Sequence, residues 1–237
     1  MIEYYASYIP SIVGANQYKD QHLEIIEQRF KYFKKKGIIV DKELERLSVL
    51  EKEYKKKFSD GVSKSKVAIL TAQAEREENA SERKEIIKKL SRTVYGNFNE
   101  KVILEKLLEE QNITVTDNNK ENFSLEYDGF KVLGRIDGFT VLNDEKYLVE
   151  IKSRVGAFKE KIPFYELVQI TVLMKLTNTE KCLFVQSSRN FIRTGIIKFD
   201  KELYEKIISI LSQVTPLIKE QDEEKFKSEL KNINKLN

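Results

Sequence analysis

The chain has 237 residues, 41% of them hydrophobic and 34% charged, so it can bury a sizeable core beneath a strongly ionic surface. Lys and Arg number 42 and Asp and Glu 38, and the resulting net charge of +4 is only weak support for a nucleic-acid partner. The lone cysteine, Cys182, excludes an intrachain disulfide and a cysteine-based metal cluster, and the lone histidine, His22, argues against a histidine zinc site or a Ser-His-Asp triad.

No basic segment followed by an apolar one opens the chain, and no run of about 18 apolar residues occurs in it. We therefore expect no secretory signal, no membrane span and an intracellular location, cytoplasmic or nuclear. The lysine-, isoleucine- and asparagine-rich composition fits an AT-rich genome, as in a phage or a large DNA virus whose protein acts in the host cell.

The N-terminal part, residues 1–92, is predicted to be helical because its apolar residues recur at steps of three and four. The expected elements are a short turn capped by Ser7 and ended by Gly14, then helices over 20–36, 41–58 and 65–92. Residues 75–83 are so polar that we expect the third helix to be exposed there on most sides or broken. Tyr95-Gly96-Asn97 is expected to end this region, and Asn97 or Asn99 to cap a further helix that reaches Gln111.

After Asn112 the apolar period changes from helical to alternating, which predicts an antiparallel run of strands. The expected strands are residues 113–116, 123–127, 131–136, 139–142 and 146–152. Pro163 then begins a helix over 164–176 that is apolar on most sides and should be buried. Strands over 182–186 and 195–199 and one or two amphipathic helices over 201–230 complete the chain. We expect one domain, 1–237, with a catalytic core at 93–200 and a C-terminal helical segment at 201–237.

The strand that ends in Glu150-Ile151-Lys152 carries the strongest chemical signal in the sequence. Alternation places Glu150 and Lys152 on one face, and Asp137 ends the preceding predicted strand. One acid followed by Glu-x-Lys can hold a divalent cation beside an ammonium group, and Mg²⁺ prefers such oxygen ligands. Asp137 and Glu150 are the expected metal ligands, with the Ile151 carbonyl as a further oxygen. The plain alternative is a pair of edge strands with solvated charges.

Two further residues fit the same site. A third acid can come from the helix that ends at Gln111, either Glu100 or Glu105, although Glu100 also suits a helix N-terminus without any ligand. Gln169 lies in the middle of an apolar helix, where its amide needs a partner: a metal-bound water, Lys152 or a backbone group. Lys152 is expected to position or deprotonate the attacking water and to benefit from a pKa lowered near the metal.

In this order the motifs resemble the PD-(D/E)xK nuclease superfamily: Gly134-Arg135-Ile136-Asp137-Gly138, then Val149-Glu150-Ile151-Lys152-Ser153, then the helix with Gln169. More narrowly, the chain is similar to the YqaJ-type viral recombinase family, whose best-known relative is the lambda-phage exonuclease. Three further stretches carry this resemblance: the opening residues from Ala6-Ser7-Tyr8 to Tyr18-Lys19, Gly96-Asn97-Phe98-Asn99-Glu100, and Tyr165 through Gln169 to Met174.

The resemblance implies an α/β (α+β) fold with a mixed central sheet flanked by helices, a restriction-endonuclease-like core. It implies Mg²⁺-dependent digestion of DNA, with Mn²⁺ as a substitute, by ring-shaped homotrimers in some members and alongside a single-strand annealing partner. The residues it assigns are a catalytic set of Glu100, Asp137, Glu150 and Lys152 supported by Gln169, and substrate contacts at Ser7, Arg135 and Tyr165. The family's arginine before the opening serine is missing, and Arg29, Arg135 and Arg193 are the candidates to replace it.

The leading hypothesis from the sequence is therefore a Mg²⁺-dependent exonuclease that acts on linear duplex DNA in recombination, repair or replication. A structure- or sequence-selective endonuclease of the same superfamily is the alternative within this chemistry. A non-catalytic DNA-binding or scaffold protein is the alternative outside it, against which the intact acid–acid–lysine set argues. Iron–sulfur relatives are disfavoured by the single cysteine.

Overall fold

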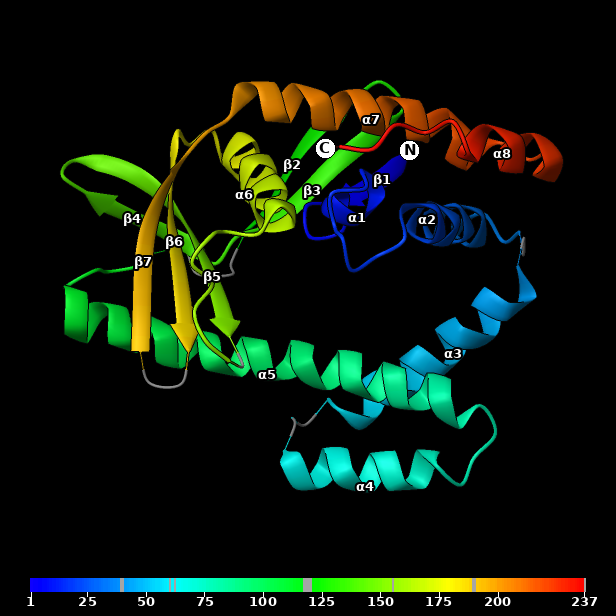
Figure 1. The fold of residues 1–237 in the computed structure, drawn as a ribbon, viewed down its shortest axis with the longest axis horizontal. Coiled ribbons are helices and arrows are strands. Elements are labelled where there is room, and N and C mark those ends of the chain that lie inside the picture. The colour runs from blue at the N-terminus through cyan, green and yellow to red at the C-terminus, as the bar shows by residue number, and fades with distance from the viewer. Residues whose placement is uncertain are drawn as a thin grey trace.

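The chain folds into two mixed β-sheets flanked by helices, which confirms the predicted α/β class (Figure 1). The computed structural model describes residues 1–38, 41–59, 61, 63–116, 121–154, 156–188 and 191–236, and for 92–99 and 101 the helical backbone alone. Its strands are β1 (Ile2–Tyr5), β2 (Asn122–Tyr127), β3 (Phe130–Arg135), β4 (Gly138–Leu142), β5 (Glu145–Arg154), β6 (Lys181–Ser188) and β7 (Phe191–Lys198). Its helices are α1 (Ile9–Ile12), α2 (Gln21–Lys35), α3 (Lys42–Lys57), α4 (Lys64–Ala74), α5 (Ala80–Gln111), α6 (Phe164–Thr177), α7 (Lys201–Lys219) and α8 (Glu223–Leu230).

The strands divide into a sheet of order β1-β3-β2 and a sheet of order β4-β5-β6-β7. The prediction of one antiparallel run is therefore wrong, since β3 and β4 are consecutive in the chain but belong to different sheets. Two parallel pairs, β1 with β3 and β5 with β6, make both sheets mixed. Strand β1 was not predicted, and residues 113–116 contribute only an isolated bridge from Thr116 to Phe139.

Helix α6 lies against both sheets and forms the centre of the main hydrophobic core. Leu148 of β5 and Phe184 of β6 face this core, together with Val132 of β3. Val149 points to the opposite face of the second sheet, where it packs against Leu107 of α5. The alternation predicted for β5 is thus confirmed, because one face of the strand meets α6 and the other meets α5.

The helical boundaries of the N-terminal part follow its capping residues. The side chains of Asp20 and Asp41 accept backbone hydrogen bonds at the starts of α2 and α3. Ser7 is not a cap: α1 begins after Tyr8, and no side chain caps it. Of the two alternatives for residues 75–83, exposed or broken, the structure shows a break, since α4 ends at Ala74 and α5 starts at Ala80.

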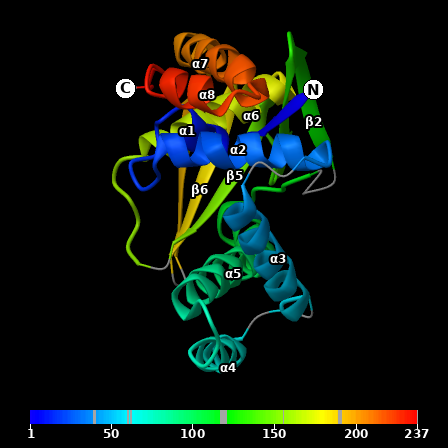
Figure 2. The same cartoon turned by 90° about the vertical axis from the view of Figure 1, so that its right-hand side faces the viewer.

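Helix α5 runs without interruption through Tyr95-Gly96-Asn97, so the predicted break and the caps at Asn97 or Asn99 are wrong. The helix packs at both ends, which explains its continuity. Ile87 and Leu90 join a small core with α3 and α4, and Ile103 and Leu107 pack under the second sheet. The predicted limit between the helical part and the catalytic core, after residue 92, falls inside this helix. Figure 2 shows α3, α4 and the start of α5 below the rest of the molecule.

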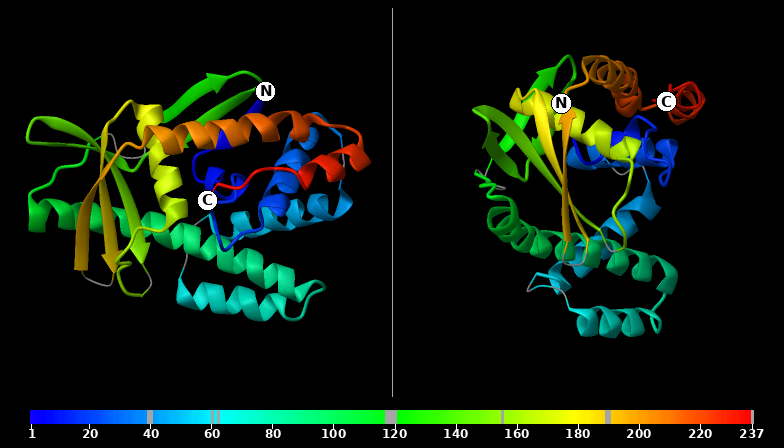
Figure 3. Two further views of the ribbon diagram at one scale, coloured as in Figure 1. Left: turned by 45° about the horizontal axis from the view of Figure 1, so that its top comes forward. Right: turned by 60° about the vertical axis from the view of Figure 1, so that its left-hand side comes forward.

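The C-terminal segment returns to the N-terminal one. Helices α7 and α8 lie over α1, α2 and α6, and both chain ends lie close to them (Figure 3). The Leu236 N–H donates to the Val13 carbonyl at 2.8 Å, and the Gln21 amide donates to the Asn234 carbonyl at 2.9 Å. Within the described ranges, no helix has the length and apolar character that crossing a membrane requires.

Gly134 of β3 gives a direct test of how closely α6 packs on the first sheet. A Cβ added there would lie 2.6 Å from side-chain carbons of both Leu173 and Leu176. We expect Gly134→Ala to lower the free energy of unfolding by about 1–3 kcal/mol, because two core side chains must move. Urea denaturation followed by circular dichroism measures this change.

Gly195 in β7 is the matched control, since a Cβ there meets nothing within 4 Å. Gly195→Ala should change the free energy of unfolding by less than about 0.5 kcal/mol. Equal stabilities of Gly134→Ala and the wild type would show that α6 does not press on β3 as described.

Candidate active site

The register of β4 on β5 brings Asp137 beside Glu150. Gly138 is opposite Val149 in this antiparallel pair, so Asp137 and Glu150 occupy the next opposing positions, whose side chains share a face. The Oδ2 atom of Asp137 accepts a hydrogen bond from the Ile151 N–H at 2.6 Å. Strand pairing thus brings an acid that precedes β4 beside the middle of β5.

Glu150 is buried, with an exposed fraction of 3%, and its charge is balanced by two neighbours. The Lys152 Nζ donates to Glu150 Oε1 at 2.6 Å. The Gln169 amide of α6 donates to the same oxygen at 3.0 Å, and its own carbonyl oxygen accepts from Lys152 Nζ at 3.0 Å. Each of these three side chains therefore bonds to the other two. The amide noted on the apolar helix is half-buried, and its partners are Glu150 and Lys152.

Asp137 lies in an environment that opposes its ionised form. Burial raises the pKa of its carboxyl group well above the ordinary value, and the charge of Glu150 raises it further. The charge of Glu100 also raises this pKa. The hydrogen bond from the Ile151 N–H and the charge of Lys152 lower it. Negative charge is therefore concentrated around Asp137, which is the condition that a cation relieves.

Of the two acids considered on α5, the structure favours Glu100. Its charge acts on Asp137, whereas Glu105 is exposed. Helix α5 covers the opposite face of the second sheet from α6, so Glu100 approaches Asp137 from a different layer than Gln169 does. Glu100 lies inside α5 rather than in its first turn. It therefore does not serve to complement the dipole at a helix N-terminus, which was the alternative explanation for this acid.

Lys152 carries a pKa that is raised rather than lowered. Burial alone lowers the pKa of its ammonium group, but the charge and hydrogen bond of Glu150 and the charge of Asp137 outweigh it. The lysine is therefore positively charged at neutral pH in the structure described. The lowered pKa expected from the sequence applies to a lysine beside a bound cation and stays a prediction.

Oxygen atoms of the kind that Mg²⁺ prefers lie near the middle of β5. Because the N–H and C=O of a strand residue face the same neighbouring strand, the carbonyl of Ile151 faces the Asp137 side, as its N–H does. With the carboxylates of Asp137 and Glu150, it forms a hard-oxygen donor set, the chemistry that Mg²⁺ selects. Across the described part of the chain, no group of three or more Asp, Glu, His or Cys side chains stands ready to hold a metal ion.

A second buried ion pair extends the site and was not predicted. Arg154 continues the alternation of Glu150 and Lys152, and its guanidinium donates to both oxygens of Glu166 on α6 at 2.6 Å. Its Nε atom also donates to Gln186 Oε1 at 3.0 Å. Glu166 precedes Gln169 by one helical turn, so this pair holds the start of α6 on β5. Two features of the sequence could have predicted this pair: Arg154 continues the alternation of charged residues along β5, and Glu166 is an acid on an otherwise apolar helix.

The three predicted substrate contacts lie around this centre. Arg135 is exposed at the end of β3, two residues before Asp137. Ser7 is exposed two residues beyond Tyr5, which pairs with Leu133, so Ser7 and Arg135 follow parallel strands at the same end of the first sheet.

Tyr165 lies in the first turn of α6, with its ring centroid 6.1 Å from that of Tyr18 and 5.7 Å from Lys159 Nζ. Of the arginines considered as replacements for the missing one, Arg29 is buried and bonded to Glu223 and the Glu220 carbonyl. Arg193 is exposed on β7.

Comparison with known proteins shows a likeness in fold. No protein-family model matches the chain. No curated protein matches it in sequence. The crystal structure of an alkaline exonuclease, LHK-Exo, from Laribacter hongkongensis is similar at a TM-score of 0.52 and 13% identity, covering 92% of this chain and 90% of that one. LHK-Exo in complex with dAMP gives a TM-score of 0.50 at 13% identity over 97% and 90% of the two chains. The chain therefore shares the fold of this enzyme over nearly its whole length.

The buried Arg154–Glu166 pair predicts a large loss of stability when one partner is removed. Glu166 is 3% and Arg154 11% exposed, so Glu166→Gln leaves the guanidinium buried without its counter-charge. We expect the free energy of unfolding to fall by about 3–5 kcal/mol. Chemical denaturation monitored by circular dichroism measures it.

The control is Glu205→Gln, which removes the same charge from the exposed pair with Lys201 on α7, 3.7 Å apart. That variant should lose less than about 1 kcal/mol. Similar losses in the two variants would contradict a special role of the buried pair in fixing α6.

Proposed function

We propose that this chain is a Mg²⁺-dependent deoxyribonuclease that degrades linear duplex DNA from its ends. The observation that carries the proposal is the hydrogen-bonded network of the buried Glu150 with the half-buried Lys152 and Gln169, beside Asp137. The plain alternative, edge strands with solvated charges, does not describe it, because Glu150 is buried and β5 lies inside its sheet between β4 and β6. The fold shared with an alkaline exonuclease, one of whose structures holds dAMP, supports the same conclusion.

Asp137, Glu150 and the Ile151 carbonyl are the proposed ligands, with Glu100 as an additional carboxylate from α5. A Mg²⁺ ion bound there supplies charge neutralisation at the phosphate and an activated water. Burial raises the pKa of Asp137 and the charges of Glu150 and Glu100 raise it further, so a bound cation would relieve this repulsion.

The roles of the remaining residues follow from their contacts. Lys152 presents an ammonium group beside the carboxylates, where it opposes the charge of a phosphate and holds the attacking water. Gln169 fixes that ammonium by accepting its hydrogen bond at 3.0 Å. Arg135 and Ser7, both exposed at the same end of the first sheet, are proposed to contact the DNA backbone, as is Tyr165 of α6. A homotrimeric assembly and a single-strand annealing partner remain predictions from the family resemblance.

The proposal predicts different fates for linear and covalently closed DNA. With Mg²⁺ the purified protein should degrade linear duplex DNA and leave a closed circle intact, and chelation should stop the reaction. Gel electrophoresis of the two substrates over time measures this. Cutting of the closed circle would instead establish the endonuclease alternative. Binding without any cutting, with Mg²⁺ or Mn²⁺, would establish the non-catalytic alternative.

Variants of the site decide whether this centre does the cutting. Asp137→Asn keeps an acceptor for the Ile151 N–H, and Lys152→Gln keeps a donor for Glu150, so both should fold. Each should lower the cleavage rate by about 100-fold or more, because Asp137→Asn removes a charged metal ligand and Lys152→Gln removes the positive charge opposite the reacting phosphate.

Glu100→Gln and Glu105→Gln form a matched pair on α5. Only the first should lower the rate, because Glu105 is exposed and outside the site. Wild-type rates in folded Asp137→Asn or Lys152→Gln, checked by thermal unfolding, would refute the assignment.

A further inference from the structure

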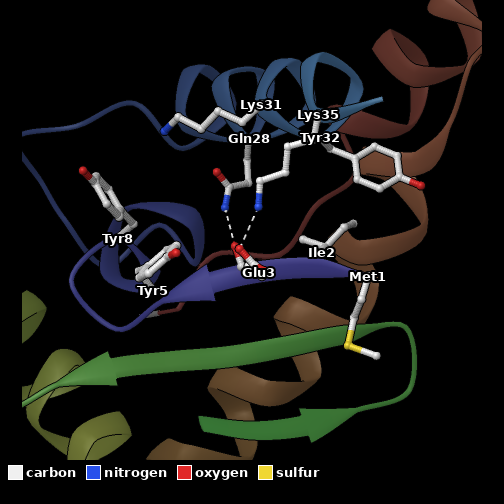
Figure 4. A pocket seen from close by; sticks show the side chains of 9 residues that line it. All are labelled: Met1, Ile2, Glu3, Tyr5, Tyr8, Gln28, Lys31, Tyr32 and Lys35. Carbon is white, nitrogen blue, oxygen red and sulfur yellow. Dashed lines mark hydrogen bonds and ion pairs between the residues drawn. The ribbon is translucent and has the colours of Figure 1, made fainter. Parts of the chain in front are cut away.

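A groove lies between β1 and α2, and none of the proposed catalytic residues lines it. Figure 4 shows the side chains that line it, among them Tyr5, Tyr8, Tyr32, Gln28, Lys31 and Lys35. We call it the tyrosine groove. Its volume is about 270 Å³, below the roughly 300–1,000 Å³ of pockets that enclose a small ligand. A groove of this size is better suited to bind one part of a longer molecule than to enclose a whole small ligand.

The tyrosine groove is poorly suited to an added protein strand. In the described structure β1 pairs with β3 alone, so its other edge would be the place for such a strand. The Gln28 amide, however, donates to the Glu3 carbonyl on that edge at 2.9 Å, and Lys35 bonds the Glu3 carboxylate at 2.7 Å (Figure 4). A strand that paired with β1 would have to displace Gln28 from this carbonyl.

Aromatic rings and ammonium groups instead give the groove the chemistry of a stacking surface. Tyr5 and Tyr8 are 48% and 42% exposed, a high fraction for large side chains. Lys31 Nζ lies 5.1 Å from the Tyr8 ring centroid, and Lys36 Nζ lies 4.5 Å from that of Tyr32. Bases stack on exposed aromatic rings while neighbouring lysines meet phosphates, and this requires bases that are not paired.

The acids near the groove leave it able to take an anion. Glu3 forms an ion pair with Lys35. Glu27 lies 3.8 Å from Lys31, and the side chains of Glu27 and Lys31 are both about half exposed. Pairs of this kind are weak in water, so a phosphate can replace the carboxylate as the partner of Lys31. The rings then bind bases while Lys31 meets the backbone.

We propose that the tyrosine groove binds an unpaired DNA strand next to the site of cleavage. Tyr5 and Tyr8 flank Ser7, and β1 runs parallel to β3, which leads to Asp137 four residues after the Leu133 that pairs with Tyr5. A strand in the groove therefore continues toward the catalytic carboxylates. The inference rests on the proposed nuclease function for the location of the cut, but not for the binding itself.

The test is fluorescence anisotropy of a labelled oligothymidylate, titrated in EDTA so that no cleavage occurs. Tyr8→Ala should weaken binding by about fivefold to a hundredfold, which is the loss of one stacked base. Tyr8→Leu should weaken it similarly, because it keeps an apolar side chain but no ring, and Tyr8→Phe should bind as the wild type does. The Tyr8 side chain makes no cap hydrogen bond, so these variants should fold.

Lysine variants test the phosphate contact. Lys31→Ala should lower the slope of log affinity against log salt by about 0.7, the value for one phosphate of a single strand. Lys201→Ala is the matched control, since it removes a lysine from another exposed pair, with Glu205 at 3.7 Å, and should leave the slope unchanged.

Three results would overturn the inference: no binding of oligothymidylate by the wild type, equal affinity of the wild type and Tyr8→Ala, or wild-type affinity in Tyr8→Leu. The last two would show that oligothymidylate binds without stacking a base on Tyr8. Duplex cleavage by the wild type is measured separately. If the wild type cleaves duplex DNA but Tyr8→Ala binds oligothymidylate as the wild type does, only the proposed role of the groove is refuted. If oligothymidylate binding depends on Tyr8 but the wild type does not cleave DNA, only the proposed function is refuted.

Discussion

The compensation of the buried Glu150 carboxylate by Lys152 and Gln169 is the interaction on which the arrangement of β5 and α6 depends. An ionised carboxylate with 3% exposure is strongly destabilising unless it is paired and hydrogen-bonded. Lys152 comes from the same strand and Gln169 from a helix, so the carboxylate is satisfied only when α6 lies on that face of β5. The Arg154–Glu166 pair fixes the same two elements one step further along the strand. Polar contacts therefore determine where an otherwise apolar helix lies.

This arrangement is a costly way to stabilise a fold. A buried ion pair is often no more stabilising than apolar residues of the same volume, and here two such pairs lie side by side on β5. The repulsion around Asp137 adds a further unfavourable contribution, which strand pairing holds in place. Unfavourable charge that is retained at the end of a strand, beside exposed basic and aromatic side chains, is typical of sites where function determines the residues.

The sequence allowed the centre of this site to be predicted because its geometry is local. Alternation along β5 determines the face of Glu150 and Lys152, and Gln169 was conspicuous as an amide on an apolar helix. Asp137 required the pairing of β4 with β5, which a short turn at Asn143 and Asp144 makes predictable. The residue pattern alone left Glu100 and Glu105 open, because the choice depends on how α5 passes beneath the sheet, and only the family resemblance selected Glu100.

The parts that were not predicted depend on contacts between distant segments. Strand β1 is four residues long and is recognisable only by its pairing with β3, more than a hundred residues away. Helix α5 continues through Gly96, although a glycine costs about 1 kcal/mol in a helix, because buried residues on both sides of it pack against other elements. The separation of β3 from β4 into different sheets likewise follows from tertiary packing, since α6 fills the space over β2 and β3.

The most direct test of the central claim is a crystal structure of the protein grown with Mn²⁺, with anomalous scattering used to locate the ion. The account predicts an anomalous peak about 2.1 Å from carboxylate oxygens of Asp137 and Glu150 and near the Ile151 carbonyl, with Lys152 still on the same face. A structure in which Mn²⁺ saturates the crystal elsewhere, and in which Glu150 remains bonded to Lys152 with no ion beside Asp137, would contradict it.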